Sequence, residues 1–219
     1  MTTIWRLLGF GGGLFLGMIL HEYVHARVAL AMGDRSGKAY GRVTPNPKAH
    51  IDPVGTVVIP ALFLIPILVG HPITGFIFGY AKPVPVNYGT WRGQKRAPLI
   101  VAAAGPATNF AIALLAGLAL KATIGSGAAI PGYTIALAGI LTVNCFLAVI
   151  NALPIPPLDG SRALGLFLSP QAAHRMEELG QYFLLFLVAL FLFFSRVIPA
   201  LVDPVCRAAS FGSLIGCPL

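Results

Sequence analysis

Charged side chains are scarce in this sequence. Of its 219 residues only 10% are Asp, Glu, Lys or Arg, whereas about a quarter are charged in an ordinary soluble domain. Hydrophobic residues make up 57% of the chain, and the mean hydropathy is +0.82. This composition excludes an ordinary soluble domain and indicates an integral multi-pass protein, which we expect to reside in the cell membrane and to contact the lipid bilayer.

Other absences narrow the class further. The chain has 3 cysteines, and none has the CxxC spacing of a structural zinc site. The net charge of +8 comes from Lys and Arg in loops between apolar runs, with no basic stripe or recognition motif, so we expect no nucleic-acid partner. No small-residue cleavage site follows the first apolar run, so we expect no signal peptide.

Long apolar runs predict an all-α polytopic membrane protein with about four full transmembrane helices, since roughly 20 apolar residues suffice for a span. Pro60 and Pro66 interrupt one run and favour a helical hairpin or re-entrant segment there. Turn formers around Tyr40 to Thr44 predict a short β-hairpin near the active site. We expect a single membrane-embedded domain, residues 1–219, with spans at about 4–32, 54–80 (the helical hairpin), 97–120, 133–153 and 181–202.

The first run contains His21-Glu22-Tyr23-Val24-His25. Residues four apart share one helix face, so the two histidines can bind one metal ion. Glu22 projects about 100° away, where its carboxylate can reach a metal-bound water without ligating the ion. Ionisable groups at membrane depth cost a few kcal/mol each and are functional by default. The motif therefore indicates a zinc hydrolase.

A catalytic zinc ion takes three protein ligands and keeps a fourth position for water. The candidates for the third ligand are His50, Asp52, His71 and Asp159. Asp159 is favoured because it follows a Pro-broken segment at a membrane helix end, where irregular backbone is tolerated only if it faces protein or a wet cavity. An ordinary Leu-Asp-Gly turn is the alternative interpretation.

Three motifs together resemble the signatures of the site-2 protease family of intramembrane zinc metalloproteases. They are the His-Glu-x-x-His motif, Gly105-Pro106-Ala107-Thr108-Asn109, and the stretch NALPIPPLDG from Asn151 to Gly160. The resemblance extends from the first helix to about Arg162. It suggests a compact member, because the chain contains no insertion long enough for a PDZ domain and no regulatory CBS domain.

The resemblance also implies roles for individual residues. His21, His25 and Asp159 would bind one zinc ion per chain, and Glu22 would be the general base and then the proton donor. Asn151 would steady the substrate or the oxyanion.

The function that we expect is that of an intramembrane metalloendopeptidase, which hydrolyses peptide bonds within or near transmembrane segments of protein or peptide substrates. Zinc lowers the pKa of bound water towards about 7, and Glu22 would accept the proton. The alternative is a non-proteolytic membrane metal-binding protein or transporter, but a storage site needs no carboxylate beside its first ligand. A catalytically dead scaffold is disfavoured because all four expected residues are present.

Two further asparagines lie in the apolar runs. For Asn144 an interhelical hydrogen bond is favoured over an active-site role, and for Asn109 packing with Gly105 is favoured. His174 with Glu177 and Glu178 is interpreted as a solvated helix face.

Positive charge indicates the orientation of the chain. Basic loops stay in the cytoplasm, so we expect the more basic side to be cytoplasmic. The rise of a helix then places His25 roughly 10 Å below that surface. Cys206 and Cys217, on the opposite side, are expected to pair. Four of the 15 Lys and Arg residues lie on that opposite side, and the other eleven are Arg27, Arg35, Lys38, Arg42, Lys48, Lys82, Arg92, Lys95, Arg96, Arg162 and Arg175.

Overall fold

The computed structural model describes residues 2–61, 65, 79–91, 96–127, 130–182 and 197–212. Within these ranges every regular element is helical. η1 and η3 are π-helical, and η2, η4 and η5 are 3₁₀-helical. The elements are α1 (Thr2–Arg6), η1 (Leu7–Gly11), α2 (Gly12–Ala31), α3 (Ser36–Ala39), η2 (Pro47–Ala49), η3 (Pro53–Val58), η4 (Tyr88–Trp91), α5 (Arg96–Gly125), α6 (Pro131–Ala152), α7 (Asp159–Gly165), α8 (Pro170–Glu178), η5 (Leu179–Tyr182) and α10 (Val197–Ala209).

Three of the described helices are long and apolar enough to cross a membrane, so the protein is a membrane protein. They are Thr3–Ala31, which joins α1, η1 and α2, together with Arg96–Gly125 and Pro131–Ala152. Each agrees with a predicted span. Most of the predicted span 181–202 and of the predicted helical hairpin 54–80 lies outside the described residues, so the count of four spans stays a prediction.

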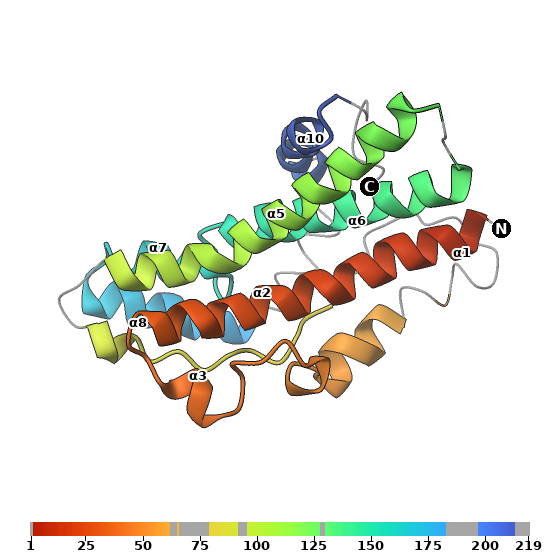
Figure 1. Cartoon of the computed structure of the whole chain (residues 1–219). Helices are drawn as coiled ribbons and strands as arrows, with labels where there is room; N and C mark the ends of the chain where they lie inside the picture. Colours follow the sequence, from red (N-terminus) through yellow and green to blue (C-terminus); the bar gives the residue numbers. More distant parts are fainter. Residues whose placement is uncertain are drawn as a thin grey trace.

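The helix α5 packs against both α2 and α6, and its C-terminal end diverges from the first helix (Figure 1). Small residues allow this close approach in lipid, where helix association depends on packing. A Cβ on Gly9 would lie 2.6 Å from the carbonyl oxygen of Ala136 on α6, and one on Gly13 would lie 2.9 Å from the Cα of Ile140. Gly9 and Gly13 therefore act as packing positions, whereas a Cβ on Gly11 or Gly12 would meet nothing within 4 Å among the described residues.

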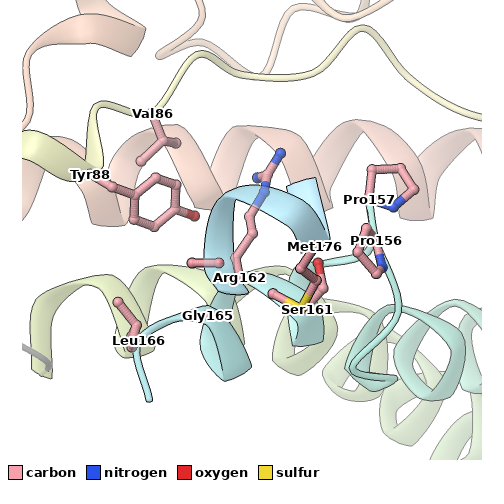
Figure 2. A pocket seen from close by; sticks show the side chains of 10 residues that line it. Val86, Tyr88, Pro156, Pro157, Ser161, Arg162, Gly165, Leu166 and Met176 are labelled. Carbon is pink, nitrogen blue, oxygen red and sulfur yellow. The ribbon is translucent and has the colours of Figure 1, made fainter. Parts of the chain in front are cut away.

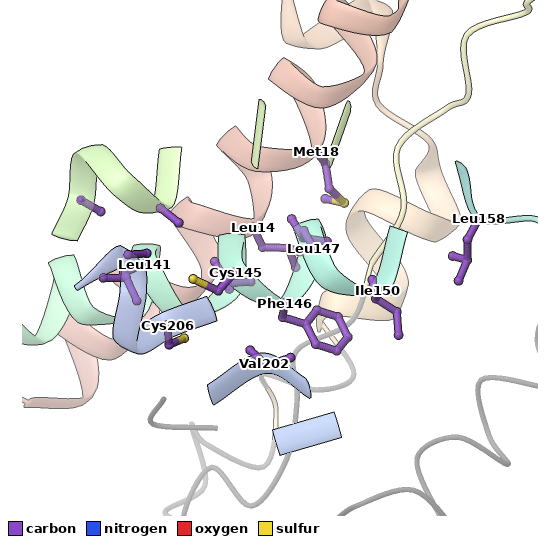
Figure 3. Packing of buried hydrophobic residues seen from close by; sticks show 14 of the residues in the cluster. Leu14, Met18, Leu141, Cys145, Phe146, Leu147, Ile150, Leu158, Val202 and Cys206 are labelled. Carbon is purple, nitrogen blue, oxygen red and sulfur yellow. The ribbon is translucent and has the colours of Figure 1, made fainter. Parts of the chain in front are cut away.

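Apolar side chains of α6 form the centre of the main core cluster. Figure 3 shows Leu141 and Phe146 of α6 beside Val202 and Cys206 of α10. Cys206 is disulfide-bonded, whereas Cys145 is free and buried. Cys217, the predicted partner of Cys206, lies outside the described residues, so this pairing stays a prediction.

The β-hairpin predicted around Tyr40 to Thr44 is not confirmed, because the described residues of this region contain no strand. Residues 33–53 form α3, a 3₁₀ turn and several other turns. The reason is that local groups satisfy the backbone. Asp34 accepts a hydrogen bond from the backbone N–H two residues later, and Gly41 has a φ of 66°, a turn conformation that interrupts an extended strand.

Candidate metal centre

Buried nitrogen and oxygen atoms from two distant helices converge at one point. His21 and His25 lie one turn apart on α2, and Asp159 is the first residue of α7. The two histidine Nε2 atoms are 3.1 Å apart, and they lie 2.9 and 3.0 Å from Oδ2 of Asp159. The structure thus brings together the three residues that the sequence predicts as ligands.

This donor set fits zinc in both chemistry and size. Two imidazoles and one carboxylate are a common ligand set for catalytic zinc, with bonds of about 2.0–2.2 Å. In a tetrahedron with such bonds the ligand atoms lie about 3.3–3.5 Å apart. The three donor atoms, which are 2.9 to 3.1 Å apart, need to separate by only a few tenths of an ångström.

The other candidates for the third ligand have different roles. His50 is buried, and its Nε2 lies 2.8 Å from the carbonyl oxygen of Thr44. Asp52 caps η3 by accepting hydrogen bonds from the backbone N–H groups of Val54 and Gly55. Neither belongs to the cluster. His71 lies outside the described residues.

The helix α5 fixes both imidazole rings. A Cβ on Gly105 would collide with the rings of His21 and His25, so only glycine lets α5 approach them this closely. Nδ1 of His25 donates to the carbonyl oxygen of Val101 at 2.8 Å. Pro106 lies in the same part of α5 and cannot donate the usual helical hydrogen bond. Gly105 thus lets α5 lie directly against the metal centre.

Asn109 contributes to the site in a way that the packing interpretation missed. Its Oδ1 lies 2.6 Å from Nδ1 of His21, so the amide oxygen accepts a hydrogen bond from the ring N–H and leaves Nε2 for a metal. The sequence contained a signal for this role, because Asn109 follows Gly105 by four residues and therefore lies on the same face of the helix. The interhelical hydrogen bond favoured for Asn144 is confirmed, since Asn144 Oδ1 accepts from Nδ2 of Asn109 at 3.0 Å.

The two predicted catalytic residues line one cavity of about 100 Å³, which also borders His21. Oε2 of Glu22 accepts a hydrogen bond from the backbone N–H of Val84 at 2.8 Å. Val84 belongs to a segment that runs beside α2 (Figure 1). Asn151 donates from Nδ2 to the carbonyl oxygen of Leu147 on its own helix. Its predicted role toward a substrate therefore stays a prediction.

A second, larger cavity of about 430 Å³ is lined by residues on both sides of Asp159 in the sequence, including Pro157 and Ser161. Figure 2 shows the side chain of Arg162 reaching into it, with the Tyr88 hydroxyl directed toward the guanidinium. Nη1 of Arg162 lies 3.6 Å from Oδ1 of Asp159. Prolines and apolar side chains, including Pro157 and Met176, form the rest of the lining. One cation therefore lies beside the carboxylate of the metal centre.

The carboxylate of Asp159 is held in its charged form. Burial alone would raise the pKa of Asp159, but hydrogen bonds with His21 and His25, and the charge on these rings, bring that pKa well below its usual range. For Arg162, burial would lower the pKa, but the neighbouring Tyr88, Asp159 and Glu22 raise it. Both groups are therefore ionised at neutral pH.

Known proteins similar to this chain share a common description. The chain is 32% identical over 181 residues to "Putative zinc metalloprotease YwhC" of Bacillus subtilis (strain 168), a match that covers 80% of this chain and 76% of YwhC. It is 31% identical over 180 residues to "Putative zinc metalloprotease Rip2" of Mycobacterium tuberculosis (strain H37Rv), covering 82% of this chain and 65% of Rip2. Rip2 of Mycolicibacterium smegmatis is 31% identical over 178 residues.

The match spans slightly less than two thirds of the length of these Rip2 proteins. No family model matches the chain. No solved structure matches it either.

Proposed function

The chain belongs to the site-2 protease family of zinc metalloproteases, and we propose that it is an intramembrane endopeptidase. Its substrates would be membrane proteins, or peptides derived from them, cleaved within or near their transmembrane segments. The observation that carries the proposal is the convergence of His21, His25 and Asp159 inside an apolar helix bundle, with Glu22 at the adjoining cavity. These three residues would hold one zinc ion per chain.

The roles of the side chains follow from their positions. When bound, zinc would lower the pKa of water towards about 7 and polarise the scissile carbonyl. Glu22 would accept a proton from the attacking water and return it to the leaving amine, so the carboxylate is regenerated in each cycle. The hydrogen bond from Val84 engages Oε2. This bond orients the carboxylate and leaves Oε1 to carry the proton.

The positions of the two cavities suggest where an unwound substrate would bind. The segment from Tyr80 to Tyr88 borders both of them, with Tyr80 at the catalytic cavity and Tyr88 at the larger one. Between these ends, Val84 contacts Glu22. A substrate bound beside this segment would place its scissile bond near Glu22. Its flanking residues would lie in the cavity that contains Arg162.

The test compares wild-type protein with Glu22→Gln, which keeps the size of the side chain but removes the base. Both proteins are reconstituted in liposomes with a set of model single-span proteins, and fragments are identified by mass spectrometry. We expect equal zinc content and a loss of cleavage of about 10²- to 10⁴-fold. Equal cleavage by both proteins would exclude this mechanism. Zinc binding without cleavage by the wild type would favour the metal-binding alternative.

A further inference from the structure

A buried polar chain crosses three membrane helices and ends at the metal centre. It begins at Asn144 on α6, continues through Asn109 on α5 and reaches His21 on α2. Asn144 and Asn109 are both 0% exposed. Polar groups in a membrane interior are costly unless they are paired, so the direction of every hydrogen bond in this chain matters.

The direction is set at Asn144. Its Nδ2 donates to two backbone carbonyl oxygens, those of Ile140 at 2.9 Å and Gly13 at 3.2 Å. Carbonyl oxygens only accept, so they hold the amide nitrogen on their side and direct Oδ1 of Asn144 toward Asn109.

The same reasoning applies to the next residue. Nδ2 of Asn109 donates to Oδ1 of Asn144 at 3.0 Å and to the carbonyl oxygen of Gly17 at 3.2 Å. The amide oxygen of Asn109 must therefore point the other way, at Nδ1 of His21, 2.6 Å distant. An amide oxygen cannot donate, so Nδ1 carries a proton, and Nε2 is the ring nitrogen directed at Asp159 and available to a metal.

We propose that Asn144 is a positioning residue of the metal centre, which acts through Asn109 to fix the tautomer and ring orientation of His21. Asn144 itself is not part of the ligand cluster. The inference rests on the metal-binding part of the proposed function and is independent of proteolysis.

The two histidines differ in the kind of group that holds their Nδ1 atoms. Nδ1 of His25 is held by the backbone carbonyl of Val101, which no side-chain substitution removes. Nδ1 of His21 is held by a side chain whose own orientation depends on another side chain. The side-chain hydrogen bonds thus link α6 to the metal centre through His21, and partners of this kind typically change metal affinity by about 10- to 100-fold.

A simple structural role for Asn144, as a link between helices, makes a different prediction, and a double-mutant cycle separates the two. Asn144→Leu removes one of the two acceptors that orient Asn109 and leaves only the carbonyl oxygen of Gly17, so Asn109 turns its nitrogen toward His21 more readily. Asn109→Asp places a carboxylate at this position, and both of its oxygens accept, so its orientation no longer matters. The effect of Asn144→Leu should therefore depend on which residue occupies position 109.

The measurement is zinc affinity in detergent solution, by competition with a chelator, with thermal unfolding recorded separately for each variant. We expect Asn144→Leu to weaken zinc binding by about 10- to 100-fold in the wild-type background and by less than about threefold in the Asn109→Asp background. Thr142→Val is the matched control, because Thr142 is on the same helix, is also 0% exposed and has no hydrogen-bond partner for its hydroxyl among the described residues. This variant should keep wild-type affinity.

Two results would overturn the inference. One is wild-type zinc affinity in Asn144→Leu, and the other is an equal loss of affinity in both backgrounds, which is the outcome for a helix link alone. Wild-type protein that binds no zinc would overturn the proposed metal centre, and the positioning role with it.

Discussion

At the scale of single residues, the metal centre depends on one carboxylate. Oδ2 of Asp159 lies within 3.0 Å of both histidine Nε2 atoms. The pKa of this group is lowered by the same contacts, so the charged form that metal binding requires is already favoured. These contacts join α2 and α7, which are separated by more than a hundred residues.

We therefore expect Asp159→Ala to lose most of its zinc, because two imidazoles are too few donors to replace the hydration shell of the metal. Elemental analysis of the purified variant provides the measurement. Asp52→Ala is the control, because Asp52 is an acidic residue that caps η3 and does not belong to the cluster. Full zinc content in Asp159→Ala would show that another residue supplies the third ligand.

The residue scale also shows what the sequence could predict of the site. The His-Glu-x-x-His spacing is a local helical property, and the segment before Asp159 is broken by prolines, so these ligands were predictable. The roles of Asn109 and Val84 were harder to predict. Each acts across an interface between segments more than 60 residues apart, and the N–H of Val84 is a backbone group with no distinctive residue type.

At the scale of elements, the segment from Tyr80 to Tyr88, which runs beside α2, donates backbone hydrogen bonds to two carboxylates. Glu22 accepts from the backbone N–H of Val84, and Asp34 accepts from the backbone N–H of Asn87, both at 2.8 Å. Pro83 and Pro85 prevent this stretch from forming a helix. Asp34 follows the end of α2 and thus joins that helix to the wall of the larger cavity.

The contribution of Asp34 to the stability of the protein depends on pH. Burial would raise the pKa of Asp34, but hydrogen bonds from Ser36 and Asn87 lower it below the usual value. A carboxylate with a lowered pKa in the folded state stabilises the protein fully above its unfolded pKa of about 4, and this contribution is lost as pH falls through the lower folded value.

We expect Asp34→Asn to lower the free energy of unfolding by about 1–3 kcal/mol near pH 7, because an amide cannot accept both hydrogen bonds as well as a carboxylate does. Thermal unfolding in detergent between pH 3 and pH 7 measures this. The difference between wild type and variant should shrink toward the acidic end. A difference that is constant with pH would contradict the role of the charge.

The membrane helices could be predicted from the sequence, but the connections between them could not. The described membrane helices agree closely with the predicted spans, because length and continuous hydrophobicity are sufficient to define a span. The connection between α2 and the next span is different. Its glycines, prolines and short polar side chains are compatible with several turn types. Hydrogen bonds from the backbone N–H groups of Asn87 and Lys82, to Asp34 and to the carbonyl oxygen of His50, help to decide among them.

At the scale of the whole molecule, the metal centre lies toward one end of the helix bundle. The end of α2, the start of α5, α7 and α8 lie together at that end, whereas the start of α6 and the end of α5 lie at the other (Figure 1). Basic residues follow the same division. Arg35 and Lys38 lie at α3, Arg96 begins α5, and Arg162 is on α7. We propose that this end is cytoplasmic, because basic loops are retained there.

Two variants, each with one added cysteine, test this orientation without altering any charge. Ala39→Cys places a thiol at the end of α3, and Ser126→Cys places one in the connection between α5 and α6, and both positions are exposed. In intact cells, a membrane-impermeant maleimide should label only Ser126→Cys. After the membrane is permeabilised, it should label both variants.

The native thiols leave this experiment with little background. Cys145 is 0% exposed, Cys206 is disulfide-bonded, and Cys217 is its predicted partner, so we expect none of the three to react in the absence of reductant. The opposite result would contradict this orientation: Ala39→Cys would be labelled in intact cells, and Ser126→Cys only after permeabilisation. The zinc site would then lie near the outer surface. The substrates within reach would then be cleaved on that side, because the depth of the metal in the bundle sets which end of a membrane-spanning segment meets Glu22.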